Sequence, residues 1–363
     1  MAHGLSRRDL ARSSLLTLGS FAILRHARGD APLELRCSLD TAPSHPRNVA
    51  FHDYLGKLEA ASGGQIKTKL FESGSLFPNL QVVKALVQGQ VEMVCPGTWT
   101  ITGFVPDADF SQLPAFYGQP TDTVHKATDG PAGKFVNDAV VKKLGVEVLG
   151  NWFDLGFNNW YSTKKPLNAL ADLKDMKLRS PGGVLNSWRI RFFGGIPNVT
   201  AWPDVPLAMS QGTFDGLIST NESVNSAKLF DSGLRHSLQD HQGMGLYVPM
   251  INKDFWGKLP KPLQEKILQL WAENLPTYRT NTAKSQEDGR KALEGHEVGF
   301  VDVPQDELAA VRKKMLPEQD KAAADDPDLA GIAVRALPLY MRDLPSAAAI
   351  AQAAIDLALE LKR

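Results

Sequence analysis

The order of strand-like and helix-like segments after residue 30 is the feature that most constrains the fold. Residues 33–39 alternate apolar and polar side chains as a half-buried strand does, and apolar residues within 51–58 recur at helical spacing. A second strand is predicted over residues 65–71, a second helix ends at Gly89, and a third strand follows over residues 91–95. Strands that alternate with helices predict a parallel sheet with helices on its faces.

The joint between the second helix and the third strand recurs later in the chain. Residues 88–93 read Gln-Gly-Gln-Val-Glu-Met, and residues 211–216 read Gln-Gly-Thr-Phe-Asp-Gly. In each, a glycine ends a helix and a strand then runs into a polar turn. Two lobes of the same α/β design would produce this repeat, and chance similarity over six positions is the alternative.

The remaining segments continue the same alternation. Strands are predicted over residues 146–152, 160–163 and 299–303, and a helix begins at Pro262, because proline is favoured in the first helical turn. The tail over residues 353–361 has a helical, alanine-rich pattern. Because no low-complexity linker separates the halves, we expect the lobes to share crossing strands.

Residues 1–30 have the pattern of an export signal. Arg7 and Arg8 precede a mostly apolar run, residues 13–24, which is too short for a stable membrane-spanning helix. The paired arginines indicate the twin-arginine route. We expect residues 1–30 to be a signal peptide that is removed on export, which leaves a soluble periplasmic protein.

Cys37 and Cys95 are the only cysteines, and both fall in predicted strands. Side chains on neighbouring parallel strands stand side by side, a geometry that rarely suits a disulfide. The pattern therefore favours two buried thiols, with a disulfide as the alternative. One cysteine pair is too few for a metal site, and no metal or cofactor is expected.

Charge and motifs exclude several classes of function. Forty basic residues balance forty acidic ones, so nothing in the net charge points to nucleic acid or an anionic membrane as partner. The eight histidines form no zinc motif, and no serine-hydrolase elbow, phosphate loop or dinucleotide fingerprint is present. We therefore expect no catalytic residues, and any anion must be recognised by a few local donors.

Arg179 is the strongest candidate for such a donor. A predicted strand carries it to the strand's C-terminal end, where Pro181 and Gly182 turn the chain towards the next helix. Ligands of open parallel sheets bind beyond the carboxyl ends of strands, and a guanidinium is a planar fork that matches a carboxylate. Taken alone, the pattern also fits a surface arginine before a loop.

Six stretches, in order and spacing, resemble the solute-binding proteins of tripartite ATP-independent periplasmic (TRAP) transporters. The similarity covers roughly residues 33–275. The stretches are His45-Pro46, Gly63-Gly64-Gln-Ile, Ser73-Gly74-Ser-Leu76, residues 84–93 (Lys-Ala-Leu-Val-Gln-Gly-Gln-Val-Glu-Met), residues 173–181 (Leu-Lys-Asp-Met-Lys-Leu-Arg-Ser-Pro) and residues 204–216 (Asp-Val-Pro-Leu-Ala-Met-Ser-Gln-Gly-Thr-Phe-Asp-Gly).

The resemblance implies a two-lobed periplasmic binding protein fold of the α/β class. Each lobe is then a mainly parallel sheet flanked by helices, and hinge strands and a long helix join the two. Lobe I is expected over residues 31–156 with about 246–290, and lobe II over residues 157–245 with about 291–363. The expected partners are a small organic acid and the membrane subunits of a TRAP transporter, and a monomer is expected.

The resemblance also implies which residues bind the ligand. By it, Arg179 carries the ligand carboxylate and Trp202 covers the ligand. Ser219 falls where many members have an amide that also binds the carboxylate. The resemblance adds the first-lobe wall at Asp40, Gly97, Thr98 and Trp99, the nearby polar residues Thr220 and Asn221, and the rim candidates His45, Glu72 and Asn186.

Asn158 departs from the family pattern, because several members have a second arginine there. A single fixed cation argues for a single carboxylate, since a second buried carboxylate without a partner would be costly. Trp99, Trp152 and Trp202 could then form a wall for an apolar or aromatic portion of the ligand.

Two other functions stay open at this point. An exported hydrolase or lyase on a two-lobed scaffold would be supported by a nucleophile and a base within hydrogen-bond reach in the cleft. A sensor-type binding protein, whose closed form docks on a receptor, would share the same fold and the same binding residues.

Overall fold

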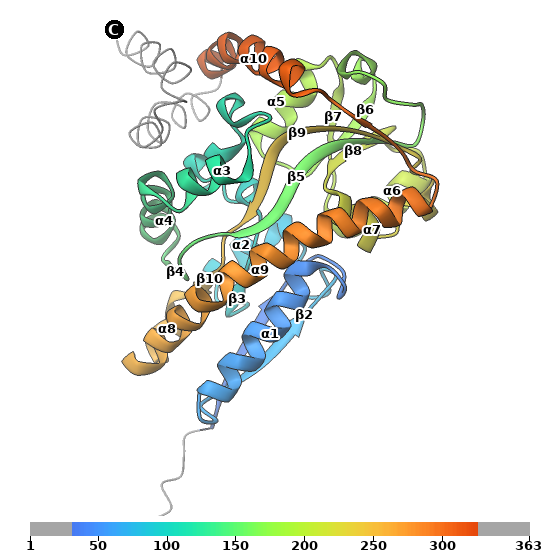
Figure 1. The fold of residues 1–363 in the computed structure, drawn as a ribbon. Helices are drawn as coiled ribbons and strands as arrows, with labels where there is room; N and C mark the ends of the chain where they lie inside the picture. Colours follow the sequence, from blue (N-terminus) through green and yellow to red (C-terminus); the bar gives the residue numbers. More distant parts are fainter. Residues whose placement is uncertain (1–30, 326–363) are drawn as a thin grey trace, which may run out of the picture.

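The first of two sheets in the computed structural model, which describes residues 31–325, contains the predicted N-terminal strands (Figure 1). Its strand order is β2-β1-β3-β10-β4, from β1 (Leu33–Ser38), β2 (Ile66–Phe71), β3 (Met93–Val94), β4 (Val146–Val148) and β10 (Met250–Asn252). Strand β1 pairs in parallel with β2 and β3, whereas β10 is antiparallel to both its neighbours. Helices α1 (Pro46–Ala61), α2 (Asn79–Val87), α3 (Thr121–Thr128), α4 (Pro131–Leu144) and α8 (Lys253–Lys258) belong to this lobe.

Successive residues of these strands enter two hydrophobic cores on opposite faces of the sheet. Val94 and Met250 pack with α2 and α4 in one core, while Met93 and Ile251 pack with α1 in the other. Alternating side chains of a strand point to opposite faces, so a sheet covered on both sides needs apolar residues at both positions. This explains why Met93, Val94 and Cys95 are apolar at successive positions.

The second sheet has the strand order β11-β9-β5-β8-β6-β7. Its strands are β5 (Phe153–Ser162), β6 (Lys177–Ser180), β7 (Ile196–Val199), β8 (Gly216–Ser219), β9 (His236–Tyr247) and β11 (Gly299–Asp302). Strand β6 is parallel to β7 and β8, and β5 is antiparallel to β8 and β9. Helices α5 (Val184–Phe192), α6 (Val205–Ser210), α7 (Asn221–Ser226) and α10 (Gln305–Asp325) belong to this lobe.

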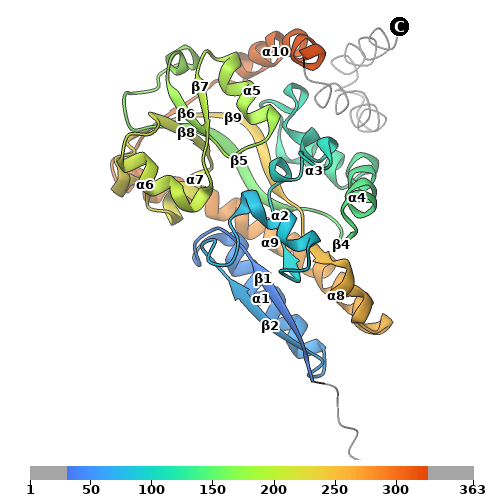
Figure 2. The same ribbon diagram turned by 180° about the vertical axis from the view of Figure 1, so that it is seen from behind.

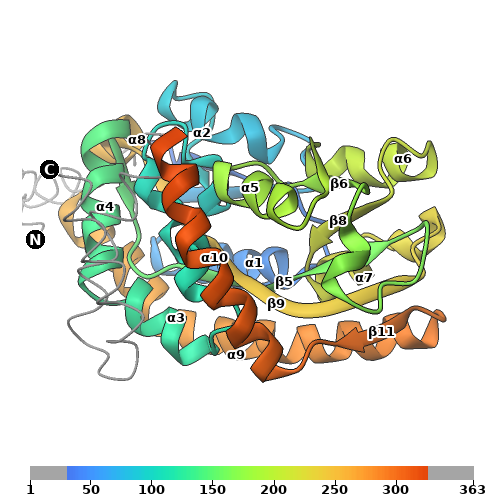
Figure 3. The ribbon, with the colours of Figure 1, turned by 90° about the horizontal axis from the view of Figure 1, so that it is seen from above.

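Three segments cross between the lobes, as expected from the absence of a linker (Figures 1 and 3). Strand β5 starts with Phe153 in a first-lobe core and reaches Trp160 in a second-lobe core, and β9 runs back in the opposite direction. Helix α9 (Lys261–Gly295) places Trp271 in the first lobe and Leu293 in the second. The predicted lobe boundaries at 156/157 and 245/246 fall inside β5 and β9, and they stay a prediction.

Both repeated joints have the predicted form. Helix α2 ends before Gly89 (φ 70°) and α6 ends before Gly212 (φ 68°), and β3 and β8 follow. These left-handed conformations are open to glycine at little steric cost. Cys37 and Cys95 are buried free thiols, the arrangement that the strand geometry favours.

Some predicted boundaries differ from the structure. The strand predicted over residues 146–152 ends at Val148, and the one predicted over 160–163 is the end of the longer β5. The predicted signal peptide (1–30) and the helical tail (353–361) lie outside the described residues. Within residues 31–325, no helix combines the length and apolar composition that a membrane crossing requires.

Candidate ligand-binding site

A narrow cavity lies between the two lobes, where strands of both sheets end. It is lined by six of the predicted residues: Asp40, Trp99, Asn158, Arg179, Trp202 and Ser219. In Figure 2 the part of the molecule with β6 and β8 lies above the part with β1 and α2. The volume of this cavity is about 40 Å³.

Arg179, at the end of β6, is buried with only 4% of its surface exposed. Its Nε donates to the carbonyl of Thr200 at 3.0 Å and its Nη1 to the carbonyl of Ile218 at 3.4 Å. Burial lowers the pKa of Arg179 to about 10, which still leaves it protonated at neutral pH. No carboxylate of the described residues forms an ion pair with it, so a buried cation in the cavity retains donors for an anion.

The indole of Trp202 covers this guanidinium. The Arg179 Cζ lies 5.2 Å from the Trp202 ring centroid, within the range of a cation–π contact. Trp202 starts the short helical turn before α6, which places the ring over the cavity that it lines. An anion on Arg179 would therefore lie beside an aromatic face.

Three further polar side chains in the cavity have unused hydrogen-bonding capacity. Asn79, Asn158 and Ser219 are each less than a tenth exposed, and their side chains make no hydrogen bond to any residue that the structure describes. Buried polar groups in folded proteins are nearly always paired. These groups together with Arg179 therefore define where a ligand must present polar atoms.

On the first-lobe side, the cavity wall carries an ion pair whose two charges cancel. Asp40 accepts a hydrogen bond from Nη2 of Arg47 at 2.5 Å, and the Arg47 guanidinium lies 4.0 Å from the ring centroid of Tyr247. Because this ion pair cancels, Arg179 supplies the net charge of the site. The electrostatics therefore favour a ligand with one negative charge.

A serine and a histidine lie within hydrogen-bond reach at the cavity, and such a pair would support an enzyme if the histidine could act as a base. The two residues are Ser223 and His45. His45 Nε2 lies 3.1 Å from Oγ of Ser223, which lines the cavity. However, His45 Nδ1 accepts the backbone N–H of Arg47, so Nε2 carries the proton and donates to the serine. An imidazole in this tautomer cannot take the serine proton, and the bond ties α1 of one lobe to α7 of the other.

Gly97, Thr98 and Asn221 do not line the cavity. Gly97 lies under the indole of Trp99, so close that a Cβ atom there would overlap the ring, and the Thr98 hydroxyl donates to Asp109 at 2.7 Å. Gly97 and Thr98 therefore lie behind the cavity wall, where they hold the wall residue Trp99 in place. The Asn221 side chain bonds Tyr161 and Gln239 on the far side of β5.

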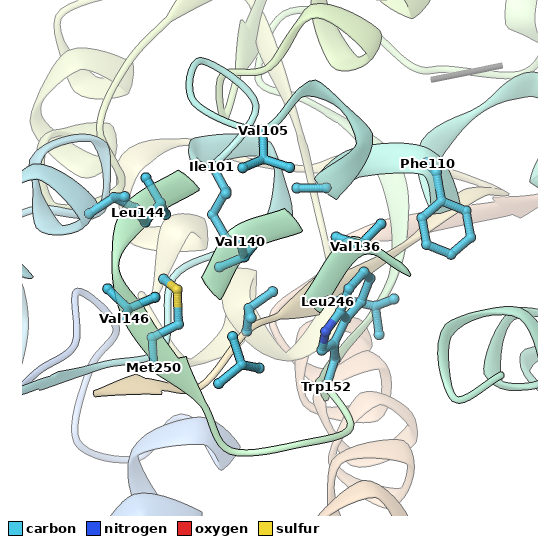
Figure 4. Close-up of a cluster of buried hydrophobic side chains, with 14 of the residues drawn as sticks. Ile101, Val105, Phe110, Val136, Val140, Leu144, Val146, Trp152, Leu246 and Met250 are labelled. Carbon is cyan, nitrogen blue, oxygen red and sulfur yellow. The ribbon is translucent and has the colours of Figure 1, made fainter. Parts of the chain in front are cut away.

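Trp152 is a core residue, which corrects its assignment to the ligand wall. It is fully buried, and Figure 4 shows it among Val136, Phe110 and Leu246. Its indole N–H donates to Asn137 Oδ1 at 2.8 Å, so its one polar atom is also satisfied inside the lobe. The rim candidates Glu72 and Asn186 are likewise absent from the lining, whereas His45 contacts it through Ser223.

A second cavity lies on the opposite face of β5. Leu155 and Asn158 line the interlobe cavity, whereas Asp154, Phe157 and Asn159 line this one. The faces do not alternate strictly, because the pairing of β5 with β9 shifts register between Asp154 and Gly156 and again between Asn158 and Trp160. Its volume is about 320 Å³. Sequence reasoning missed this cavity and also missed Tyr247, Asn79 and Ser223 in the first one, because none of them belongs to a stretch that carries the family resemblance.

Beside the ligand cavity, buried polar groups accumulate where the segment Pro106–Gln112 meets α5. Arg189 donates through Nη2 to the carbonyl of Gln112 at 2.5 Å. Asp109 is fully buried, and its Oδ2 has no hydrogen-bond partner among the described residues. Burial raises the pKa of Asp109 to about 7, against the smaller lowering effects of Thr98 and Arg189.

We expect Asp109 to make stability pH-dependent. Its folded pKa of about 7 lies above the unfolded value of about 3.9, so its contribution is present at low pH and is lost as pH rises through about 7. Between pH 5 and pH 8 this one group should remove about 3 kcal/mol of unfolding free energy. Urea unfolding at both pH values measures this loss, and the unfolding free energy of Asp109→Asn should fall by about 3 kcal/mol less than that of the wild type. A pH-dependent loss from Asp240, whose pKa burial also raises to about 7, should remain in the variant. Equal drops in wild type and variant would contradict the assignment.

Comparison with known proteins gives consistent matches. Residues 38–326 match the family model of bacterial extracellular solute-binding proteins, family 7. The chain is 25% identical over 300 residues to the C4-dicarboxylate-binding periplasmic protein of Rhodobacter capsulatus, which covers 80% of this chain and 87% of that protein.

Two solved structures share the fold. One is the sugar acid binding protein of Advenella mimigardefordensis in complex with galactonate (TM-score 0.78, 20% identity, 91% of this chain and 98% of that chain). The other is a TRAP periplasmic solute binding protein of Desulfovibrio salexigens with bound orotic acid (TM-score 0.73, 18% identity, 90% and 97%).

Proposed function

Since the chain belongs to family 7 of the bacterial extracellular solute-binding proteins, the periplasmic binding proteins of TRAP transporters, we propose that it captures a small monocarboxylate with an apolar or aromatic portion. Members of this family bind small organic acids, work with membrane subunits and are not enzymes. The chain is accordingly a transport binding protein, and the proposal concerns which acid it carries.

The observation that carries the proposal is the buried guanidinium of Arg179, which has no carboxylate partner among residues 31–317. A ligand carboxylate would supply the missing charge and occupy the free Nη donors and the hydroxyl of Ser219. Trp99, Trp202 and Tyr247 provide flat apolar surface next to this point.

The ligands named for similar proteins include acids with one carboxylate and acids with two. Galactonate and orotate carry one carboxylate each, whereas the Rhodobacter relative is named for C4-dicarboxylates. A second carboxylate would meet Asn158 and the Asp40–Arg47 pair instead of an unpaired cation. That difference favours a monocarboxylate.

A thermal-shift panel tests the proposal. Phenylacetate and small aliphatic acids should stabilise the protein, phenylacetamide should not, and succinate should have a weaker effect than the monocarboxylates. A ligand at about 100 times its Kd adds about 2.7 kcal/mol to the unfolding free energy. A neutral amide or a dicarboxylate as the tightest ligand would overturn the proposal. Light scattering on the same samples should report the mass of a monomer.

We also propose that residues 1–30 are removed after export through the twin-arginine route. Arg7 and Arg8 precede the apolar run 13–24, which is the arrangement this route requires. Replacing both arginines by lysine should abolish delivery to the periplasmic fraction, because the route depends on the pair. Unchanged export of the double variant would rule out this route and leave a general signal peptide.

A further inference from the structure

One carboxylate oxygen of Asp40 is a free hydrogen-bond acceptor in the cavity. A ligand carboxylate bound to Arg179 gives this oxygen no partner. Asp40 follows β1 in the first lobe and lines the cavity, with 6% of its surface exposed. Its Oδ1 accepts a hydrogen bond from Arg47. No donor among the residues that the structure describes reaches its Oδ2, so this oxygen is left for a ligand.

Arg47 holds this carboxylate in place. The Arg47 guanidinium donates to the carbonyl of Cys95 at 2.9 Å and to Oγ1 of Thr41 at 2.9 Å, and it stacks over the ring of Tyr247. A guanidinium fixed on all sides holds its carboxylate partner in one orientation. Asp40 is therefore a fixed carboxylate on the first-lobe wall.

Asp40 and Arg179 face the same cavity from different lobes. They form no ion pair with each other, yet the charge of Asp40 acts on Arg179 and raises its pKa, an effect that burial outweighs. A ligand whose carboxylate binds Arg179 therefore places its far end near Asp40. The carboxylate end belongs to the second lobe and the far end to the first.

The group at the far end must be a hydrogen-bond donor. A second carboxylate would oppose Asp40 with another acceptor of the same charge. An ammonium would bring a third cation next to Arg47 and Arg179, although Arg47 already balances Asp40. A hydroxyl donates without adding charge, and the free amides of Asn79 and Asn158 can pair with its oxygen or with further hydroxyls.

We propose that the ligand is a hydroxy acid that bridges the lobes, with its carboxylate on Arg179 and a hydroxyl that donates to Oδ2 of Asp40. This inference rests on the proposed function and adds the chemical class of the ligand. It also makes closure more favourable with the hydroxyl, because a ligand with a further contact on the first-lobe wall gains more from bringing the walls together.

Two matched series of acids test the inference by calorimetry. The first is butanoate, 2-, 3- and 4-hydroxybutanoate, 4-aminobutanoate and succinate, and the second is phenylacetate with its 3- and 4-hydroxy derivatives. The best hydroxy acid of a series should bind about tenfold or more tightly than its parent acid, the scale of a hydrogen bond to a charged group. Small-angle scattering should show a smaller radius of gyration with that hydroxy acid than with the parent.

Variants separate this inference from the proposed function. Asp40→Asn should reduce the preference for the hydroxy acid to about threefold or less, and Glu72→Gln, a carboxylate of the same lobe outside the lining, should keep it. Arg179→Lys should weaken parent and hydroxy acids alike. If Asp40→Asn does not fold, the wild-type comparison within each series still decides.

Three results would contradict the inference. Equal, Arg179-dependent binding of hydroxy and parent acids would overturn it and leave the proposed function intact. Tighter binding of 4-aminobutanoate would show that the far end takes a cation. Binding of none of these acids would contradict the proposed function itself.

Discussion

Arg179→Lys is expected to weaken binding of the ligand by about 1.5–3 kcal/mol, roughly ten- to a hundredfold in Kd. Lysine keeps the charge but loses the planar fork that matches a carboxylate. It also loses the contacts to the carbonyls of Thr200 and Ile218 that aim the guanidinium into the cavity. Calorimetric titration with any acid that binds the wild type measures the loss.

Two other variants make this result specific. Arg290→Lys changes an arginine that pairs with Asp302 near the second cavity and should leave binding unchanged. Arg179→Met should abolish binding without destabilising the unliganded protein, because it removes a buried cation that has no carboxylate partner among the described residues. Wild-type affinity in Arg179→Lys would mean that the anchor is another residue.

Arg47→Met is expected to destabilise the fold by about 3–5 kcal/mol. It leaves the carboxylate of Asp40 buried without its partner, and it removes the stacking on Tyr247 and the hydrogen bond to Cys95. Urea unfolding at neutral pH measures the change.

A second substitution distinguishes the lost ion pair from lost packing. Arg47→Met combined with Asp40→Asn should recover part of the stability, because the unpaired charge is then gone. If the single variant loses less than about 1 kcal/mol, Asp40 does not depend on Arg47, and the neutral first-lobe wall described above would be wrong.

The sequence led to Arg179 through a local signal and the family resemblance, and to Trp202 through the resemblance alone. Arg179 is followed by a Pro-Gly turn, which marks the end of a strand, and Trp202 precedes a proline at a helix start. The family resemblance assigned the roles of both residues, and for Arg179 the strand end had already been predicted. The ends of parallel strands gather at one edge of a sheet, so such positions meet in space.

The hinge strands were harder to predict. Strand β5 contains Asp154, Asn158 and Asn159, and β9 runs through Gln239 to Gln242, so neither shows the apolar alternation of a core strand. Except for His241, these polar residues are buried. Asn158 lines the interlobe cavity, Asp154, Asn159 and Gln239 line the second cavity, and Asp240 accepts hydrogen bonds from Tyr117 and Trp160. A periodicity argument assumes that burial means apolar packing, and it fails for strands that line cavities.

Trp152 shows the opposite error. A tryptophan near a hinge suggested an aromatic wall, but the residue lies before β5 begins, on the core side of the first sheet. Which face a side chain takes depends on register, and a shift of one residue reverses it. Nothing in the sequence around Trp152 sets that register, whereas the structure does so through the bond to Asn137.

A diffraction experiment on crystals grown with a bound acid tests the central claim most directly. The account predicts electron density between the lobes, with the ligand carboxylate about 3 Å from the guanidinium nitrogens of Arg179 and under the ring of Trp202. Density for the acid in the cavity behind β5, beside Asp154 and Arg290, or a carboxylate turned away from Arg179, would contradict it.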